Sequence, residues 1–286
     1  MAERCTDGGG PIVKPVAELP LLAARNIIGV FTDIDDTLTT DGRLPAAAYA
    51  ALERLADAGL AVVPITGRPA GWCDMVARFW PVAGVVGENG AFYFRHDRQS
   101  RRMIRRFVAS DAERAENRAR LAVLGESILA QVPGSAISAD QLYREADLAI
   151  DFCEDVPPLP PAAVDRIVAL FEEAGCVAKV SSIHVNGWFG RYDKLSMTRI
   201  FVQDVLGLDL DAARGRFVFC GDSPNDAPMF GFFPYACGVA NVLEFAGRMS
   251  ATPAFIAASR GGEGFVEIAD ILLSARQPQA ATPRAG

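Results

Sequence analysis

Three aspartates stand directly behind a hydrophobic run in the segment "GVFTDIDDTLTTDG", residues 29–42. They are Asp33, Asp35 and Asp36. Carboxylates this close repel one another, and each is costly to remove from water at the end of a buried strand. A positive charge must therefore offset the repulsion among these carboxylates, and the group that supplies this charge is expected to be part of the function.

A second acidic group, "GDSPND", follows the hydrophobic run "RFVFC" and contains Asp222, Asn225 and Asp226. In a parallel α/β sheet ligands bind beyond the carboxyl ends of the strands, so we expect these side chains to meet Asp33 and Asp35. Oxygen ligands without a neighbouring histidine suit Mg²⁺, which shares its other positions with water and substrate phosphate. The pattern therefore predicts a Mg²⁺ site that uses Asp33, Asp35, Asp222 and Asp226.

Two further polar positions fit phosphate chemistry. "TGR" (Thr66, Gly67 and Arg68) follows the run "LAVVPI", and Lys194 begins a helical pattern. A hydroxyl donor and a cation would stabilise phosphoryl oxygens. Each position also has an ordinary interpretation when taken alone: "TGR" as a loop, Lys194 as a solvated lysine, and Asp36 as a turn or helix-capping residue.

The sequence shows no motif for a serine or cysteine nucleophile activated by histidine. The sequence holds two histidines, His96 and His184, and neither lies near a serine or cysteine motif with catalytic-triad spacing. It contains no "GxSxG" and no Walker-type phosphate loop. If the chain forms a covalent intermediate, the nucleophile is therefore expected among the aspartates.

The composition restricts the class of protein. The chain has 286 residues, of which 50% are hydrophobic, and a net charge of −7. It is long enough for one large domain or two smaller ones, and the acidic balance argues against a nucleic-acid partner. Six scattered cysteines, no signal-peptide pattern and no apolar run of membrane length predict a cytoplasmic protein without a membrane partner. The sequence does not indicate an oligomeric state.

Short hydrophobic runs alternate with helical patterns, as in "IIGVFTDI", "PAAAYAALERLADAG" and "LAVVPI". This order favours an α/β fold with a Rossmann-like parallel sheet covered on both faces. In the middle of the chain "RMIRRFV" and "LAIDF" alternate, which is typical of sheets with one solvated face. We therefore expect a core interrupted by an inserted α/β cap: core residues 26–89 and 188–275, cap residues 90–187, and flexible tails at 1–25 and 276–286.

Together these motifs resemble those of the haloacid dehalogenase (HAD) superfamily of phosphotransferases. "DIDDT" is similar to its DxDxT motif, and Thr66, Lys194 and "GDSPND" match motifs two, three and four in the family's order. "TGR", "GENGA" and "DK" before a helix resemble the Cof-type branch (subclass IIB), whose large α/β cap (C2-type) lies between motifs two and three. "GDSPNDAPMF" looks like the group of sucrose, trehalose and mannosyl-phosphoglycerate phosphatases.

The resemblance implies a Mg²⁺-dependent phosphatase that acts through an aspartyl phosphate. Asp33 would be the nucleophile and Asp35 the general acid and base, while Thr66 and Lys194 would hold the transferring group. The implied metal ligands are Asp33, the backbone carbonyl of Asp35, Asp222 and Asp226, with Asn225 orienting the cluster.

The implied substrate is a small phosphate ester, chiefly a sugar phosphate or a glycosyl-glycerate phosphate. In "SSIHVNGW", His184, Asn186 and Trp188 share one parity of a strand and could face this substrate, alongside Gly67 and Arg68. Equally, His184 could be an edge residue and Trp188 a core residue.

Six arginines between Arg95 and Arg106 could bind an anionic group, although such runs commonly form a solvated face. The sequence leaves two other functions open. One is a phosphomutase, which returns the phosphoryl group to a sugar. The other is an inactive protein that keeps the fold as a sensor or scaffold.

Overall fold

The structure, a computed structural model, describes residues 13–245 and 247–276. Its centre is a six-stranded sheet in which each neighbouring pair of strands is parallel. This confirms the predicted parallel α/β core. The strand order is β1 (Lys14–Pro15), β13 (Phe255–Ile256), β12 (Ala236–Gly238), β11 (Phe217–Gly221), β2 (Gly29–Thr32) and β3 (Ala61–Pro64).

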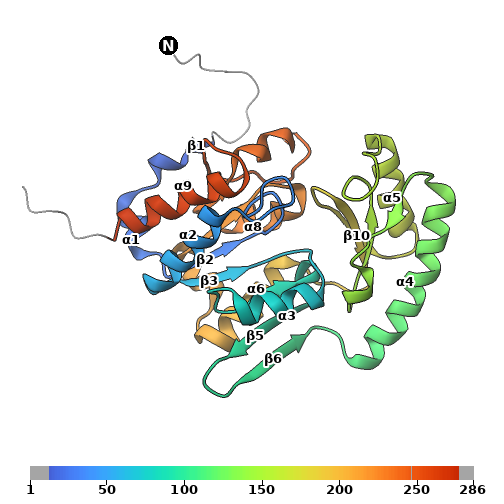
Figure 1. Ribbon diagram of the computed structural model, residues 1–286, viewed down its shortest axis with the longest axis horizontal. Helices are drawn as coiled ribbons and strands as arrows, with labels where there is room; N and C mark the ends of the chain where they lie inside the picture. Colours follow the sequence, from blue (N-terminus) through green and yellow to red (C-terminus); the bar gives the residue numbers. More distant parts are fainter. Residues whose placement is uncertain (1–12, 246, 277–286) are drawn as a thin grey trace, which may run out of the picture.

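Helices cover both faces of this sheet (Figure 1). Consecutive residues of β2 point to opposite faces, so Val30 and Phe31 pack into two different hydrophobic clusters. The cluster around Val30 receives α1 (Leu21–Asn26), α2 (Ala46–Asp57), α3 (Ala70–Phe79) and α9 (Gly261–Ser274). The cluster around Phe31 receives α6 (Lys194–Phe201), α7 (Leu210–Ala213) and α8 (Ala227–Phe232).

A three-stranded antiparallel sheet of β4 (Val85–Gly87), β5 (Phe92–Asp97) and β6 (Arg102–Phe107) extends this core. A parallel bridge from Ile65 to Val86 joins it to the end of β3. Phe92 and Phe94 are buried in the cluster around Val30, on the core side of the molecule. We expected residues 90–107 to begin the cap. The structure corrects this boundary, because the aromatic side chains of β5 bury against the core.

The inserted cap follows β6 and forms a separate body at the right of Figure 1. Its antiparallel sheet has the order β7 (Ala136–Ile137), β8 (Leu148–Asp151), β10 (His184–Trp188) and β9 (Val177–Val180). The helices α4 (Asp111–Gln131) and α5 (Pro161–Glu173) pack on one face of the sheet, around Phe171 and Val185. A Ser110–Glu113 capping box begins α4, and Pro161 begins α5. The other face of the sheet, which carries His184 and Asn186, is turned toward the core.

The segment before β2 is more ordered than we expected. Residues 1–25 were predicted to be a flexible tail, but β1 pairs with β13, and Val16 and Leu19 are buried. The apolar side chains of this segment cover the edge of the sheet, which explains its order. The rest of the two predicted tails, residues 1–12 and 277–286, lies outside the described residues.

Short helical turns complete the chain. They are a π-type turn at Val202–Leu206 and 3-10 turns at Val16–Glu18, Glu88–Gly90, Gln141–Tyr143, Arg214–Arg216, Pro224–Asp226 and Ala240–Phe245. Within residues 13–245 and 247–276, no helix combines the length and the apolar character needed to cross a membrane.

Candidate active site

The two acidic motifs meet at the carboxyl ends of β2 and β11, which are neighbouring parallel strands. The backbone N–H of Asp33 donates to the carbonyl of Cys220 at 2.9 Å, which aligns the two strand ends. As a result, one carboxylate oxygen from each of Asp33, Asp222 and Asp226 lies within 4.8 Å of the others, and all three residues are buried. The structure therefore assembles three of the four predicted metal-binding aspartates by their side chains.

Lys194 contributes the cation of this cluster. Its buried Nζ donates to Asp33 Oδ1 and to Asp226 Oδ1, each at 2.7 Å. The position is fixed because Asp193 caps α6, accepting from the backbone N–H of Ser196 at 2.7 Å. Lys194 is thus a buried partner of the predicted nucleophile and not a solvated lysine.

The electrostatics of the cluster favour an added cation. Burial raises the pKa of Asp33 to about 8, with Asp226 and Asp35 adding to the rise and Lys194 opposing it. Burial and then Asp33 raise the pKa of Asp222 well above its ordinary value. One lysine thus carries a single positive charge against three carboxylates, and the all-oxygen donor set fits Mg²⁺.

Asn241 and Thr37 orient Asp222, and sequence reasoning gave neither of them a role. Thr37 Oγ1 donates to Asp222 Oδ1 at 3.2 Å, and Asn241 Nδ2 donates to Asp222 Oδ2 at 3.1 Å. The N–H of Gly261 fixes the amide of Asn241 by donating to its Oδ1 at 3.0 Å. Thr37 lies inside "DIDDT", where the motif signals it. Asn241 lies in a short turn with no motif around it.

The Asp35 side chain is not part of the carboxylate cluster and pairs with Arg68. Arg68 Nε and Nη2 donate to Asp35 Oδ1 at 3.0 and 2.8 Å, and Nη2 also donates to Glu154 Oε1 at 2.8 Å. Burial alone would lower the pKa of Arg68, but Asp35 and Glu154 together raise it. Arg68 therefore joins the predicted acid of the core to a carboxylate of the cap.

Of the three cap residues that could face the substrate, His184 and Asn186 line the same cavity as Asp33 and Asp35. His184 Nε2 lies 2.9 Å from Glu154 Oε2, and Asn186 Nδ2 donates to Asp147 Oδ2 at 2.9 Å. The hydrogen bond with His184, followed by that with Arg68, lowers the pKa of Glu154 to about 2, against the effect of its burial. Trp188, in contrast, is fully buried and stacks on Tyr192, with ring centroids 5.5 Å apart, so it is a packing residue.

Thr66, Gly67 and Asn225 lie beside the aspartates. Thr66 is buried, and its Oγ1 accepts from the backbone N–H of Arg68 at 3.0 Å. Asn225 accepts from Ser223 Oγ at 2.8 Å. Gly67 and Asn225 line the cavity that Asp33, Asp35, His184 and Asn186 also line. This cavity holds only about 10 Å³, which is roughly the space of one water molecule.

Glu88 anchors the cap to the core. Its carboxylate accepts from the backbone N–H of Ala70 at 3.0 Å and from the cap's Glu145 and Ala146 at 2.9 and 2.6 Å. Burial, and then Asp147, raises the pKa of Glu88 to about 8. The φ angle of Glu88 is 43°, in the left-handed region, and this aims its side chain between the two bodies. The sequence signalled "GENGA" as a family resemblance but not this role.

Arg144 makes a further link between the cap and the core. It donates to the carbonyl of Gly67 at 2.9 Å and to Asp147 Oδ1 at 3.0 Å. Gly67 belongs to the predicted phosphate-binding segment, so the cap holds that segment directly.

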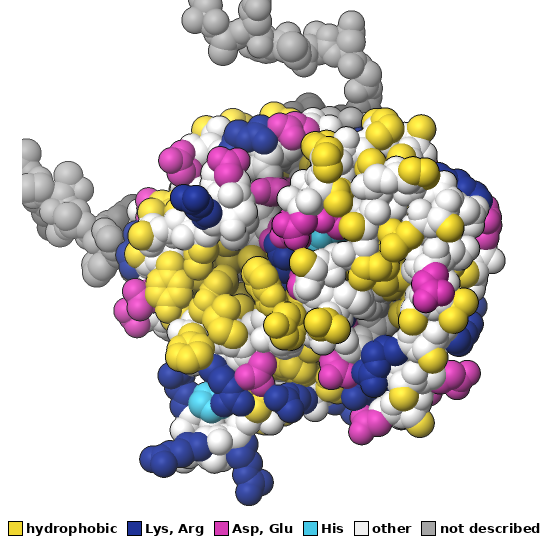
Figure 2. Space-filling view, turned by 45° about the vertical axis from the view of Figure 1, so that its right-hand side comes forward, with side chains coloured by type: hydrophobic (Ala, Val, Ile, Leu, Met, Phe, Trp, Pro, Cys, Tyr) yellow, Lys and Arg dark blue, Asp and Glu magenta, His cyan; other side chains and the backbone are white. Residues whose placement is uncertain are grey.

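The arginines between Arg95 and Arg106 lie on the β5–β6 hairpin, away from these groups. Most of them are exposed, and Arg105 pairs with Asp74 on the core surface at 2.8 Å. Figure 2 shows basic side chains gathered at the lower edge of the molecule. The run is therefore a solvated face.

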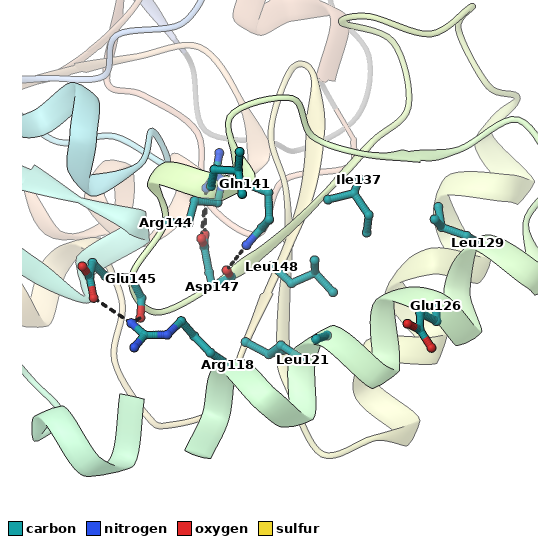
Figure 3. Close-up of a pocket in the computed structure, with 12 residues that line it drawn as sticks. Arg118, Leu121, Glu126, Leu129, Ile137, Gln141, Arg144, Glu145, Asp147 and Leu148 are labelled. Carbon is teal, nitrogen blue, oxygen red and sulfur yellow. Dashed lines mark hydrogen bonds and ion pairs between the residues drawn. The ribbon is translucent and has the colours of Figure 1, made fainter. Parts of the chain in front are cut away.

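A cavity of about 660 Å³ lies in the cap between α4 and the segment before β8 (Figure 3). Arg118 and Glu145 pair across one end at 2.8 Å, and Leu121 and Leu148 form an apolar wall. The aspartates Asp33, Asp222 and Asp226 lie elsewhere, in the cluster at the strand ends. Size alone therefore does not identify the reaction site.

Comparison with known proteins agrees with this geometry. Residues 30–114 match the sequence family described as haloacid dehalogenase-like hydrolase, and no curated protein gives a significant match. A similar solved structure is protein 0175 of Thermoplasma acidophilum, with 20% identity, a TM-score of 0.63, and coverage of 87% of this chain and 99% of that one.

Two other similar structures are phosphatases. The sucrose-phosphatase of Synechocystis sp. PCC6803, solved with sucrose and phosphate, has 17% identity and a TM-score of 0.59, over 87% of this chain and 98% of that one. The HAD subclass IIB sugar phosphatase BT4131 has 13% identity and a TM-score of 0.54, over 80% and 92%. The predicted resemblance to the haloacid dehalogenase superfamily is confirmed, as is a fold with an inserted cap.

Proposed function

We propose that this chain, which has the haloacid dehalogenase fold, is a Mg²⁺-dependent phosphatase that hydrolyses a small phosphate monoester. One observation carries the proposal: Asp33, Asp222 and Asp226 converge with Lys194 at the ends of two parallel strands. This arrangement offers a nucleophile, a site for a hard cation and a fixed positive charge within one buried cluster. The family match and the phosphatases among similar structures support it.

In the proposed reaction Asp33 attacks the phosphorus atom. A bond forms between an Asp33 carboxylate oxygen and phosphorus while the bond from phosphorus to the alcohol oxygen breaks, and Asp35 gives that oxygen a proton. Water then attacks the aspartyl phosphate, Asp35 takes its proton, and inorganic phosphate leaves Asp33. Lys194 opposes the rise in the pKa of Asp33 and so favours its ionised form for the first step.

Mg²⁺ bound by Asp33, the carbonyl of Asp35, Asp222 and Asp226 would offset the charge on the transferring oxygens. Thr66, with Gly67 and Asn225 beside it, would hold those oxygens.

The pair of Asp35 and Arg68 imposes an order on these events. Arg68 Nε lies 3.0 Å from both carboxylate oxygens of Asp35, and Arg68 Nη2 lies 2.8 Å from Oδ1, so the guanidinium covers this carboxylate. A general acid must reach the leaving oxygen, so Asp35 can act only after Arg68 has moved. Arg68 also binds Glu154 of the cap, so opening of the cap for substrate would release this contact and leave the Arg68 side chain free to move.

We propose that the substrate is a sugar phosphate or a related ester such as a glycosyl-glycerate phosphate. The buried polar side chains of His184 and Asn186 face the site and can bind hydroxyl groups. The sucrose and sugar phosphatases among the similar structures are consistent with this class.

A phosphate-release screen over sugar and glycerate phosphates tests the proposal. Activity should require Mg²⁺, vanish with excess chelator and return when Mg²⁺ is restored. Asp33→Asn serves as the inactive control. Full activity in excess chelator would refute the metal site, and formation of an isomeric sugar phosphate without inorganic phosphate would show a mutase instead.

A further inference from the structure

The side-chain amide of Asn186 has one end bound within the cap and the other end at the site. Asn186 is 2% exposed and lines the cavity under the cap that Asp33 also lines. Its Nδ2 donates to Asp147 Oδ2 at 2.9 Å. Within residues 13–245 and 247–276, no group of the protein donates to its Oδ1. This oxygen is therefore available to a ligand.

Asp147 determines which end of the amide faces the cavity. It is buried, and its Oδ1 and Oδ2 accept from Arg144 Nη1 at 3.0 and 3.2 Å (Figure 3). Burial raises the pKa of Asp147 above its ordinary value, and Arg144 and then Asn186 oppose this rise. Because both of its oxygens already accept hydrogen bonds, the amide nitrogen of Asn186 must face Asp147, and the amide oxygen must face the cavity.

Arg144 fixes this arrangement relative to the predicted phosphate-binding segment. The Arg144 side chain is 1% exposed, and its Nη1 donates to the Gly67 carbonyl at 2.9 Å as well as to Asp147. A Cβ atom placed on Gly67 would lie 3.6 Å from Asn186 Oδ1. Asn186 Oδ1 therefore lies beside the segment that is expected to hold the phosphoryl group, where it can contact the alcohol part of an ester.

A second polar atom without a protein partner lies at the same place. Asn89 Nδ2 is buried, has no hydrogen-bond partner among the described residues, and would lie 3.1 Å from that Cβ atom. The other end of this amide is occupied, since Asn89 Oδ1 accepts from Asn225 Nδ2 at 3.4 Å. A buried donor without a partner is costly, so this atom also favours a polar ligand group beside Gly67.

A hydroxyl group fits both atoms. It can donate to Asn186 Oδ1 and accept from Asn89 Nδ2. An ether or carbonyl oxygen accepts hydrogen bonds but cannot donate one, and a carboxylate would bring negative charge against Asn186 Oδ1.

We infer that Asp147 is a specificity-determining residue: it holds Asn186 Nδ2 and so turns Asn186 Oδ1 toward the substrate, which selects an ester whose alcohol carries a free hydroxyl group near the phosphate. The inference rests on the proposed phosphatase function and narrows its substrate class. Asp147 acts through Asn186 and is therefore a positioning residue.

Two esters that differ in this donor test the inference: glycerol 3-phosphate and 2,3-difluoropropyl phosphate, each with Mg²⁺. Fluorine is similar in size to a hydroxyl group but cannot donate a hydrogen bond. It also makes the alcohol a better leaving group, so the chemical step alone favours the fluoro ester. The wild-type kcat/KM should nevertheless be about tenfold higher for glycerol 3-phosphate, the effect of one or two hydrogen bonds.

Asp147→Asn should remove or reverse this preference. The new amide keeps its oxygen on Arg144 and presents its nitrogen to Asn186, so the Asn186 amide turns and points its own nitrogen into the cavity. Adding Asn186→Asp should restore the preference about tenfold, because the new carboxylate accepts from the new amide and again offers an oxygen to the hydroxyl group. A merely structural role of Asp147 would change kcat/KM equally for both esters.

Asp151→Asn is the matched control. Asp151 is a buried aspartate of the same cap sheet, and its carboxylate accepts from the backbone N–H groups of residues 153–155. This variant should keep the wild-type preference. If Asp147→Asn does not fold, Asn186→Leu tests the same oxygen and should also abolish the preference.

Equal kcat/KM for the two esters in the wild type would overturn the role of Asp147 and leave the phosphatase proposal standing. A preference that survives in Asp147→Asn or in Asn186→Leu would do the same. Turnover of an aryl phosphate without turnover of glycerol 3-phosphate would also overturn it, because a small hydroxylated ester would then gain nothing from Asn186. Failure to hydrolyse any phosphate ester would overturn both proposals.

Discussion

Two buried ionic clusters meet in this molecule, and they are built in opposite ways. In the cluster of Asp33, Asp222 and Asp226, one lysine faces three carboxylates, so the site is short of positive charge. In the cluster of Arg68, Asp35 and Glu154, a guanidinium with five donors satisfies its partners directly. The first arrangement calls for a cation from outside, while the second is complete and holds the core and the cap together.

The largest effect on activity is expected when the nucleophile of the first cluster is removed. Asp33→Asn should lower turnover by more than about 10⁴-fold, because an amide cannot form the aspartyl phosphate. No phosphate should then be found on the protein by intact-mass spectrometry after a rapid quench. Turnover that survives in this variant, or phosphate on a serine, cysteine or histidine, would contradict the mechanism.

Asp35→Asn should fail at a different step. With an aryl phosphate the leaving group needs little help from an acid, so Asp33 should still be phosphorylated. Hydrolysis of the intermediate lacks its general base and should slow by about 10²–10⁴-fold. The same mass measurement should then show phosphate accumulating on Asp33, and an unmodified protein would refute the assigned role of Asp35.

The stability of the metal-free protein should depend on pH because of the first cluster. Burial raises the pKa of Asp33 to about 8, from 3.8 in the unfolded chain, so between these values the folded state binds more protons than the unfolded state. The free energy of unfolding should therefore fall as pH rises from 5 to 8, by at least about 1.4 kcal/mol, the equivalent of one pKa unit. Urea unfolding in chelator measures it.

Mg²⁺ should flatten this dependence, and Asp222→Asn should reduce it because the variant removes one carboxylate. Metal-free Asp222→Asn should be no less stable than the wild type at pH 8. A stability that rises with pH in chelator would contradict the charge balance described for this cluster.

A double-mutant cycle measures how strongly the second cluster holds the cap to the core. Arg68→Ala and Glu154→Ala should couple by about 0.5–3 kcal/mol in the free energy of unfolding, because the pair is largely buried. The exposed pair of Arg54 and Asp270 is the matched control and should couple by less than about 1 kcal/mol. Equal coupling energies in the two cycles would mean that Arg68 does not fasten the cap.

The smallest effect is expected on the cap face of the site. Replacing His184 and Asn186 by alanine should change the ratio of kcat/KM between a sugar phosphate and ethyl phosphate by about tenfold, the loss of one or two hydrogen bonds. The rate on ethyl phosphate should change less. Equal losses on both substrates would show that these side chains do not bind the sugar.

The sequence predicted the first cluster well because each of its members follows a hydrophobic strand or begins a helix. Asp33 and Asp222 each follow a hydrophobic run that can be recognised in the sequence, and the carboxyl ends of parallel strands lie at the same edge of the sheet. It could not predict the second cluster, because Arg68, Asp35 and Glu154 come from three separate segments and the pairing depends on how the cap sits.

The cap boundary was misplaced for a related reason. The β5–β6 hairpin alternates polar and apolar residues, as a cap sheet does, and the pattern does not say which body receives Phe92 and Phe94. Asn241 was missed because its amide acts through tertiary contacts alone.

The carboxylate of Glu88 has a mechanical consequence. It fastens one edge of the cap to the core by accepting hydrogen bonds from the backbone N–H groups of residues 145–147, and these groups do not depend on the identity of the substrate. The opposite edge is held mainly by side chains at the site itself, among them Glu154 with Arg68. We therefore expect the cap to rotate about its contacts with Glu88. Such a rotation would separate the cap from the core at Asp35, while residues 145–147 keep their contacts with the core.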